Sequence, residues 1–87
     1  MANFMGGSAP AMANQIAEGY ILLSTNTLRG YLLGDLASLR VELEKLQRDA
    51  RAVVAPPDDA LAQQARNRKI ARLSSALQVV VNKMTAR

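Results

Sequence analysis

The sequence contains no cysteine, no histidine and no tryptophan, and it has only two tyrosines and one phenylalanine among its 87 residues. Without cysteine the chain cannot form a disulfide, a thiolate zinc site or a cysteine nucleophile. Without histidine it lacks the usual metal-binding imidazole and the side chain that most often transfers protons near neutral pH. Neither the P-loop nor the dinucleotide-binding glycine pattern occurs. We therefore predict that the protein is not an enzyme and has no catalytic residues, metal site, cofactor or small-molecule substrate.

Charged residues interrupt the apolar stretches of the chain. The uncharged run Gly19–Leu28 is shorter than the ~20 residues that a membrane-spanning helix needs. Residues 1–10 contain no lysine or arginine, and no apolar segment typical of a secretory signal follows them directly. We predict a cytoplasmic protein without a membrane span, and leave open export that needs no leader.

Proline and glycine divide the chain into an N-terminal arm and one helical domain. Residues 1–10 are rich in glycine and small side chains, so we expect a flexible arm, with Ser8 as a candidate helix cap. Good helix formers dominate residues 28–54, and Pro56-Pro57 ends the helical stretch. We predict one all-α domain at 11–87. It consists of helix 1 over about 11–54, which the prolines end, a turn at 55–58, and helix 2 over about 59–86, which begins at Asp58-Asp59.

Apolar residues repeat along the predicted first helix at alternating spacings of four and three residues, the a/d pattern of a coiled coil. This seam comprises Leu28, Leu32, Leu36, Leu39, Leu43, Leu46, Ala50 and Val53. A matching seam in the second helix comprises Ile70, Leu73, Leu77, Val80 and Met84. Because the turn between the helices is short, we expect an antiparallel hairpin in which the two seams pack together.

A second series of apolar and small residues, with the same spacing, lies on the opposite side of the predicted first helix. On a continuous helix this series would be exposed, and its two glycines would let another helix approach closely. The candidate protein-protein interface consists of Ile16, Tyr20, Leu23, Gly30, Gly34 and Val41. Since two helices cannot enclose a core, we predict a homo-oligomer, a dimer or higher, that completes a helical bundle.

The run Ser24-Thr25-Asn26-Thr27 leaves a second architecture open. These residues are poor helix formers because their side chains compete for backbone hydrogen bonds. If the first helix breaks near this run, residues 11–23 fold back and the monomer becomes a three-helix bundle. The sequence does not decide between the two architectures.

The second helix carries positive charge that no acid in the same helix balances. The chain has 11 lysines and arginines against 7 acids, a net charge of +4. The candidate anion or nucleic-acid patch consists of Arg66, Arg68, Lys69 and Arg72. The alternative is an ordinary solvated helix face. Because aromatic residues for base stacking are scarce, nucleic acid is the less favoured partner.

These features predict a non-catalytic, self-assembling helical protein that acts as a scaffold, an adaptor or a regulatory subunit of a larger protein complex. Its partners would be further copies of itself and another protein. The second of two alternative functions is a basic DNA-binding regulator that uses the patch on the second helix.

The first alternative is a subunit of a filament or secretion apparatus, of the needle or rod type. The length, the helical hairpin and the turn Pro56-Pro57-Asp58-Asp59 resemble the needle and inner-rod subunits of type III secretion systems. The last helix departs from that family, because it has Val79-Val80-Val81-Asn82-Lys83-Met84 where the family has an apolar-Gln-Lys ending. We therefore assign no family from the sequence.

Overall fold

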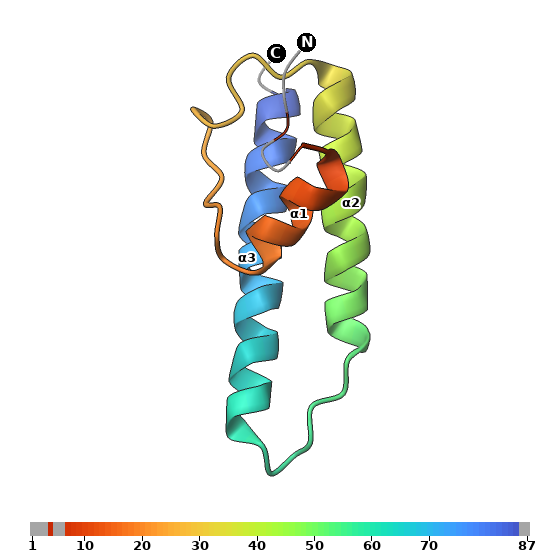
Figure 1. Cartoon of the computed structure of the whole chain (residues 1–87), viewed down its shortest axis with the longest axis vertical. Helices are drawn as coiled ribbons and strands as arrows, with labels where there is room; N and C mark the ends of the chain where they lie inside the picture. The colour runs from red at the N-terminus through yellow and green to blue at the C-terminus, as the bar shows by residue number, and fades with distance from the viewer. Residues whose placement is uncertain (1–3, 5–6, 86–87) are drawn as a thin grey trace.

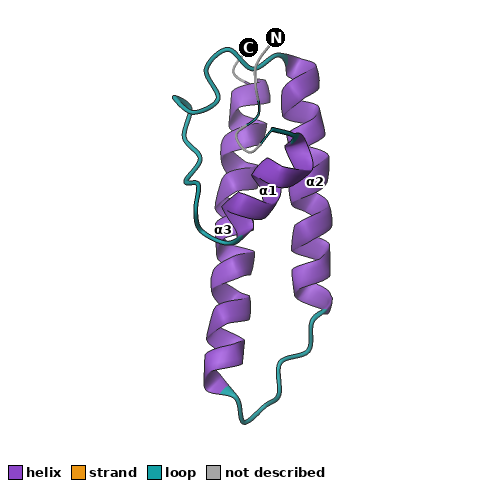
Figure 2. Cartoon of the chain, in the orientation of Figure 1, coloured by secondary structure: helices purple, strands orange, loops and turns teal. Residues whose placement is uncertain are grey.

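The computed structural model describes Phe4 and residues 7–85, and every regular element in this part of the chain is an α-helix (Figure 2). The helices are α1 at Ala9–Ala17, α2 at Leu33–Ala52 and α3 at Ala60–Thr85. α2 and α3 run antiparallel side by side, and α1 crosses obliquely over one face of this pair (Figure 1). The prediction of an all-helical protein is confirmed.

The predicted first helix is in fact two helices. α1 ends at Ala17 and α2 begins at Leu33, so the continuous helix predicted over residues 11–54 is wrong. The three-helix alternative describes the chain better, although the folded-back helix is shorter than predicted. The loop between α1 and α2 runs beside the upper part of α3, where upper denotes the half that holds the start of α2 and the end of α3 (Figure 1).

Gly19 is the residue that stops α1. Its N–H donates to the carbonyl of Ile16 at 3.1 Å, and the N–H of Tyr20 donates to the carbonyl of Gln15 at 2.9 Å. This pair of bonds is a Schellman motif, which requires a residue in the left-handed region just after the helix. Gly19 has a φ of +87°, a conformation that L side chains rarely adopt. The helix therefore ends at its glycine, several residues before the predicted break near Ser24–Thr27.

The run Ser24–Thr27 forms a turn within the loop. The N–H of Ser24 donates to Thr27 Oγ1 at 2.9 Å, and the Thr27 hydroxyl donates to the carbonyl of Ser24 at 2.8 Å. Two loop side chains, Leu28 and Tyr31, are buried in the core and anchor this segment to the helices. Gly30 has a φ of +85°, so this glycine serves the loop backbone and not a helix contact.

The start of α1 follows from its cap. The N–H of Ala11 donates to Ser8 Oγ at 3.2 Å, and Pro10 occupies the first turn, where its missing N–H costs no helix bond. The predicted flexible arm at 1–10 falls in part on residues 1–3 and 5–6, which lie outside the described residues. Of the rest, Ala9 and Pro10 belong to α1, and the ring of Phe4 contacts the ring of Tyr31 edge-on at 5.5 Å.

The core lies in the upper half of the molecule, where all three helices meet. It contains Met12, Ala13 and Ile16 of α1, Leu36, Leu39 and Leu43 of α2, and Leu73, Ala76 and Val80 of α3. The α2 and α3 members belong to the predicted seams or lie beside them. Leu32 and Val53 are exceptions, more than half exposed, because both lie just outside the ends of α2.

The connection between α2 and α3 is longer than the predicted turn at 55–58. α2 ends at Ala52 and α3 begins at Ala60, so the connection covers residues 53–59. Asp59 caps α3 by accepting the N–H of Ala62 at 3.0 Å. The predicted end of the last helix at residue 86 lies outside the described residues.

Replacing Gly19 tests where α1 ends. We expect Gly19→Ala to lower the free energy of unfolding by about 1 kcal/mol, because alanine is strained at positive φ. The added Cβ itself would fit, since it would lie 3.6 Å from the Arg72 side chain, an ordinary van der Waals contact. Gly34→Ala is the matched control: Gly34 lies in the first turn of α2 with open space around it, so alanine should be neutral or stabilise by up to about 1 kcal/mol. Urea titration followed by circular dichroism measures both. Equal stabilisation by the two variants would show that the helix continues through Gly19.

Candidate protein-protein interface

The six residues predicted as an interface do not share one surface, because the chain folds back after α1. Ile16 is 2% exposed and Leu23 is 7% exposed, and both belong to the chain's own core. This burial corrects their assignment to an intermolecular surface. The remaining four residues are exposed, but they form no continuous line. Tyr20 and Gly30 lie on the loop, and Gly34 and Val41 lie on α2.

Two residues of the predicted basic patch, Arg66 and Arg72, hydrogen-bond to backbone carbonyls at the C-terminal ends of the other two helices. Arg66 donates from Nε to the carbonyl of Val53 at 2.8 Å and from Nη2 to the carbonyl of Arg51 at 3.0 Å. Arg72 donates from Nε to the carbonyl of Ala17 at 2.9 Å. These carbonyls belong to the C-terminal ends of α2 and α1, which lack helical partners and carry partial negative charge.

The other two cations of the patch have weaker contacts. Lys69 Nζ lies 3.8 Å from Glu18 Oε1, and both side chains are more than a third exposed, so this ion pair contributes little to stability. Arg68 is exposed and takes part in no hydrogen bond or ion pair with the described residues. The structure thus gives two of the four patch residues a capping role that the sequence analysis did not identify.

The face on which α1 lies continues past the end of α1 as a shallow groove between α2 and α3. We call it the lower groove. It is lined by Ala50 of α2, by Val53 just after the end of α2, and by Ala62, Ala65, Arg66, Lys69 and Arg72 of α3, with Glu18 at its upper end. Its floor is built from small apolar side chains and its α3 edge from cations. In Figure 1 no described element covers this part of the α2–α3 pair.

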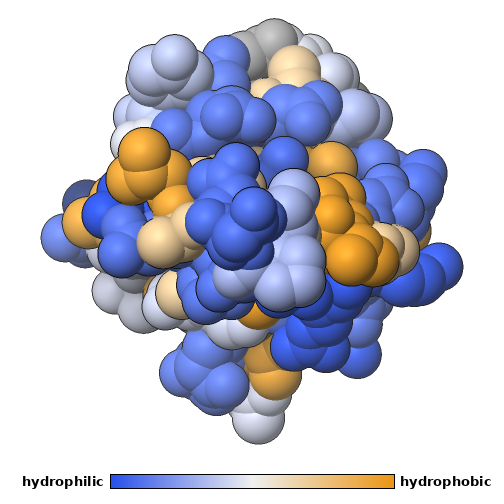
Figure 3. All heavy atoms as spheres, turned by 90° about the horizontal axis from the view of Figure 1, so that it is seen from below, coloured by the Kyte–Doolittle hydropathy of each residue, from blue (hydrophilic) through white to orange (hydrophobic). Residues whose placement is uncertain are grey.

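Large apolar side chains are exposed at the end of the lower groove. We call this end of the molecule the hairpin tip, which comprises the connection at residues 53–59 and the start of α3. Val53 is 58% exposed, Val54 89% and Leu61 78%. Figure 3 looks at the molecule from this end and shows hydrophobic groups at the surface between hydrophilic ones. Such an apolar cluster beside an alanine-floored groove is typical of a surface that another polypeptide covers.

The opposite face of the α2–α3 pair is polar. There the side chains of Gln47 and Ser74 hydrogen-bond to each other across the two helices at 2.5 Å. The shallow depression around them is lined mainly by charged and amide side chains: Arg40, Glu44, Gln47, Arg51, Ser74 and Gln78, with Leu77 and Val81. The lower groove, on the α1 side of the pair, is therefore the more apolar of these two depressions.

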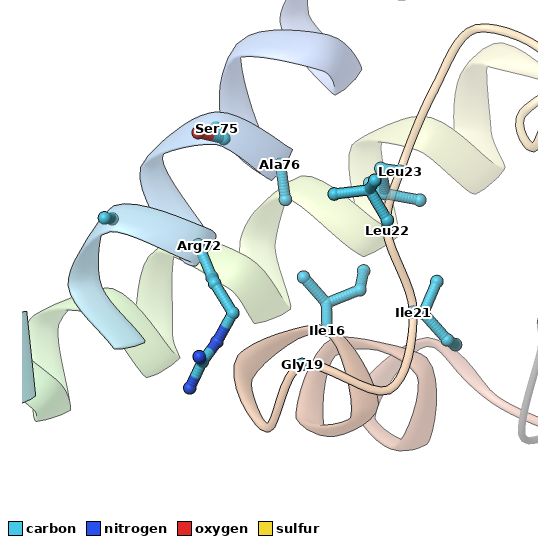
Figure 4. A pocket seen from close by; sticks show the side chains of 9 residues that line it. Ile16, Gly19, Ile21, Leu22, Leu23, Arg72, Ser75 and Ala76 are labelled. Carbon is cyan, nitrogen blue, oxygen red and sulfur yellow. The ribbon is translucent and has the colours of Figure 1, made fainter. Parts of the chain in front are cut away.

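A second hollow lies beside the end of α1, between the loop and α3 (Figure 4). Ile16 points from α1 toward Ala76, while Arg72 extends past the end of α1. Leu22, at its rim, is 88% exposed. The hollow measures about 240 Å³, below the ~300–1,000 Å³ of most small-molecule sites. No pair of titratable groups lines it, so it offers no acid-base chemistry.

The described residues contain no cluster of three or more carboxylates that could hold a metal ion, and no buried side-chain nitrogen or oxygen among them lacks a hydrogen-bond partner. None of the described helices combines the length and the apolar character needed to cross a membrane. No protein-family model, curated protein or solved structure matches the chain. The physical character of the lower groove is therefore the basis for the functional proposal.

The capping role of Arg72 is testable with methionine, which keeps the aliphatic stem and removes the guanidinium. We expect Arg72→Met to lower the free energy of unfolding by about 1–2 kcal/mol, because the partly buried carbonyl of Ala17 loses its donor. Arg68→Met removes the same charge from the same helix but no hydrogen bond, and should change stability by less than about 0.5 kcal/mol. Urea unfolding compares the two. Similar losses in both variants would mean that only net charge matters.

Proposed function

We propose that the protein is a non-catalytic helical module that self-associates through the lower groove and acts as a scaffold, an adaptor or a regulatory subunit of a larger complex. One observation carries this proposal: the groove is the uncovered continuation of the face that α1 covers. In the upper half, α1 buries Met12 and Ile16 against α2 and α3. In the lower half, Val53 on the same face is more than half exposed, and Val54 and Leu61 are exposed at the adjoining tip.

The shape of the molecule supports the same conclusion. Its radius of gyration is 13.6 Å, and its extents are 46 × 24 × 19 Å. A compact chain of this length would have a radius of gyration of about 12 Å. The excess reflects a lower half that is only two helices thick. Two packed helices leave their outer faces in contact with water, so a stable core there needs a further layer.

The energetic balance bears on how much surface takes part. Full burial of a valine or leucine side chain contributes about 1.5–3 kcal/mol, so the three exposed tip residues of each of two copies together contribute at most about 18 kcal/mol. Association costs about 4–15 kcal/mol in lost freedom of motion. The two amounts are of similar size, so burial of Ala62 and Ala65 in the groove would add to the margin and extend the contact along the groove.

The mass of the protein in solution tests this proposal. We expect the wild type to sediment as an oligomer whose population rises with concentration, and Ala65→Glu to shift the protein to monomer, because it places a larger, charged side chain in the groove floor that association would remove from water. Gln64→Glu is the matched control, since it adds the same charge at the neighbouring exposed position, which does not line the groove. Circular dichroism checks that both variants keep the wild-type helix content.

A wild type that remains monomeric up to millimolar concentration would contradict the proposal. So would an Ala65→Glu variant that keeps the wild-type mass at every concentration.

A further inference from the structure

We propose that the occupant of the lower groove is the lower groove of a second copy, related by a two-fold axis near Ala65. The lower halves of the two molecules would lie antiparallel and form a four-helix bundle. This inference rests on the self-association proposed above and adds the geometry of the contact. It is carried by the charge pattern along α3 and by the point at which α1 ends.

A row of residues along the α3 side of the groove has opposite charges at its two ends. In order, the row comprises Asp58, Ala62, Ala65, Lys69 and Arg72, at alternating spacings of four and three residues. The last four line the groove, and Asp58 lies at the tip, just before the cap of α3. The row is therefore acidic at the tip, small at its centre and basic beside α1.

A two-fold axis at Ala65 places this row against itself with opposite charges facing. Asp58 and Arg72 are each seven residues from Ala65 in sequence, with Asp58 just before the start of α3, so the tip of one copy, which carries Asp58, would face the end of the row that carries Arg72 in the other. The two alanines would meet at the axis, and small side chains there let helices pack about 8 Å apart. A parallel arrangement would instead place Arg72 beside Arg72 and Asp58 beside Asp58, which is repulsive.

The side chains at both ends of the row have unused bonding capacity. Asp58 is exposed and makes no ion pair or side-chain hydrogen bond with the described part of the chain. Arg72 uses Nε on the carbonyl of Ala17, and its two terminal nitrogens make no hydrogen bond to the described residues. An arginine whose terminal nitrogens face a carboxylate forms a charge-assisted contact. Pairing these groups across the dimer would therefore not disturb the cap on α1.

The end of α1 limits how far the two copies can overlap. Ala17 and Glu18 contact Arg72 and Lys69, so the uncovered part of α3 runs from its start at Ala60 to the level of Lys69. The tip of a second copy would meet this end of α1, which fixes the register.

Single-cysteine variants test the geometry without interference, because the native chain contains no cysteine. We expect Ala65→Cys to form a disulfide-linked dimer under mild oxidation, since the two sulfur atoms would lie at the axis, within the short Cβ separation that a disulfide requires. Gln64→Cys, one position away and off the groove, should link much less. Sedimentation of both reduced variants checks that each still associates like the wild type.

A second variant tests the charge pairing. Asp58→Lys would face Arg72 of the other copy, and we expect it to raise the dimer dissociation constant about tenfold at low salt, with a smaller effect at high salt. An associating protein in which Ala65→Cys links no faster than Gln64→Cys, or in which Asp58→Lys binds as tightly as the wild type, would overturn the two-fold geometry and leave self-association standing. A monomeric wild type would overturn self-association itself.

Discussion

The Schellman turn at Gly19 determines which part of the helical pair is covered. It ends α1 at Ala17, and the hydrogen bond from Arg72 to the Ala17 carbonyl holds that end against α3. Everything above this point has three helices around a common core. Below it, the described residues form only α2, α3 and the connection between them, with the lower groove open on the face that α1 would otherwise cover. The shape of the molecule and its unpartnered apolar surface both follow from where this one short helix stops.

Two of the cations on α3 stabilise the fold of the chain itself through hydrogen bonds to helix ends. Arg66 and Arg72 each bind carbonyls at a helix end, and both side chains also line the lower groove. The basic edge of the groove is thus a consequence of the capping that the three-helix arrangement needs. The same capping engages two of the four residues of the predicted anion or nucleic-acid patch within the chain.

The sequence was sufficient to predict features that depend on local pattern, such as the helical class, the apolar seams of α2 and α3, and the Asp59 cap. It misplaced the break in the first helix because the spacing of Ile16, Tyr20 and Leu23 fits a helix, while the glycine after Glu18 was the stronger stop signal. The lower groove could not be predicted, because it exists only where α1 does not reach. The caps by Arg66 and Arg72 join residues distant in sequence, and no local pattern reveals them.

Hydrogen exchange measured at increasing protein concentration tests most directly whether another copy covers the lower half of the molecule. The structure predicts that the backbone amides of Ala62–Lys69 in α3 become slower to exchange as the concentration rises, while those around Leu39 and Leu73, already inside the three-helix core, stay constant. Exchange that is independent of concentration throughout α2 and α3, or slowing confined to the loop around Tyr20, would contradict the account.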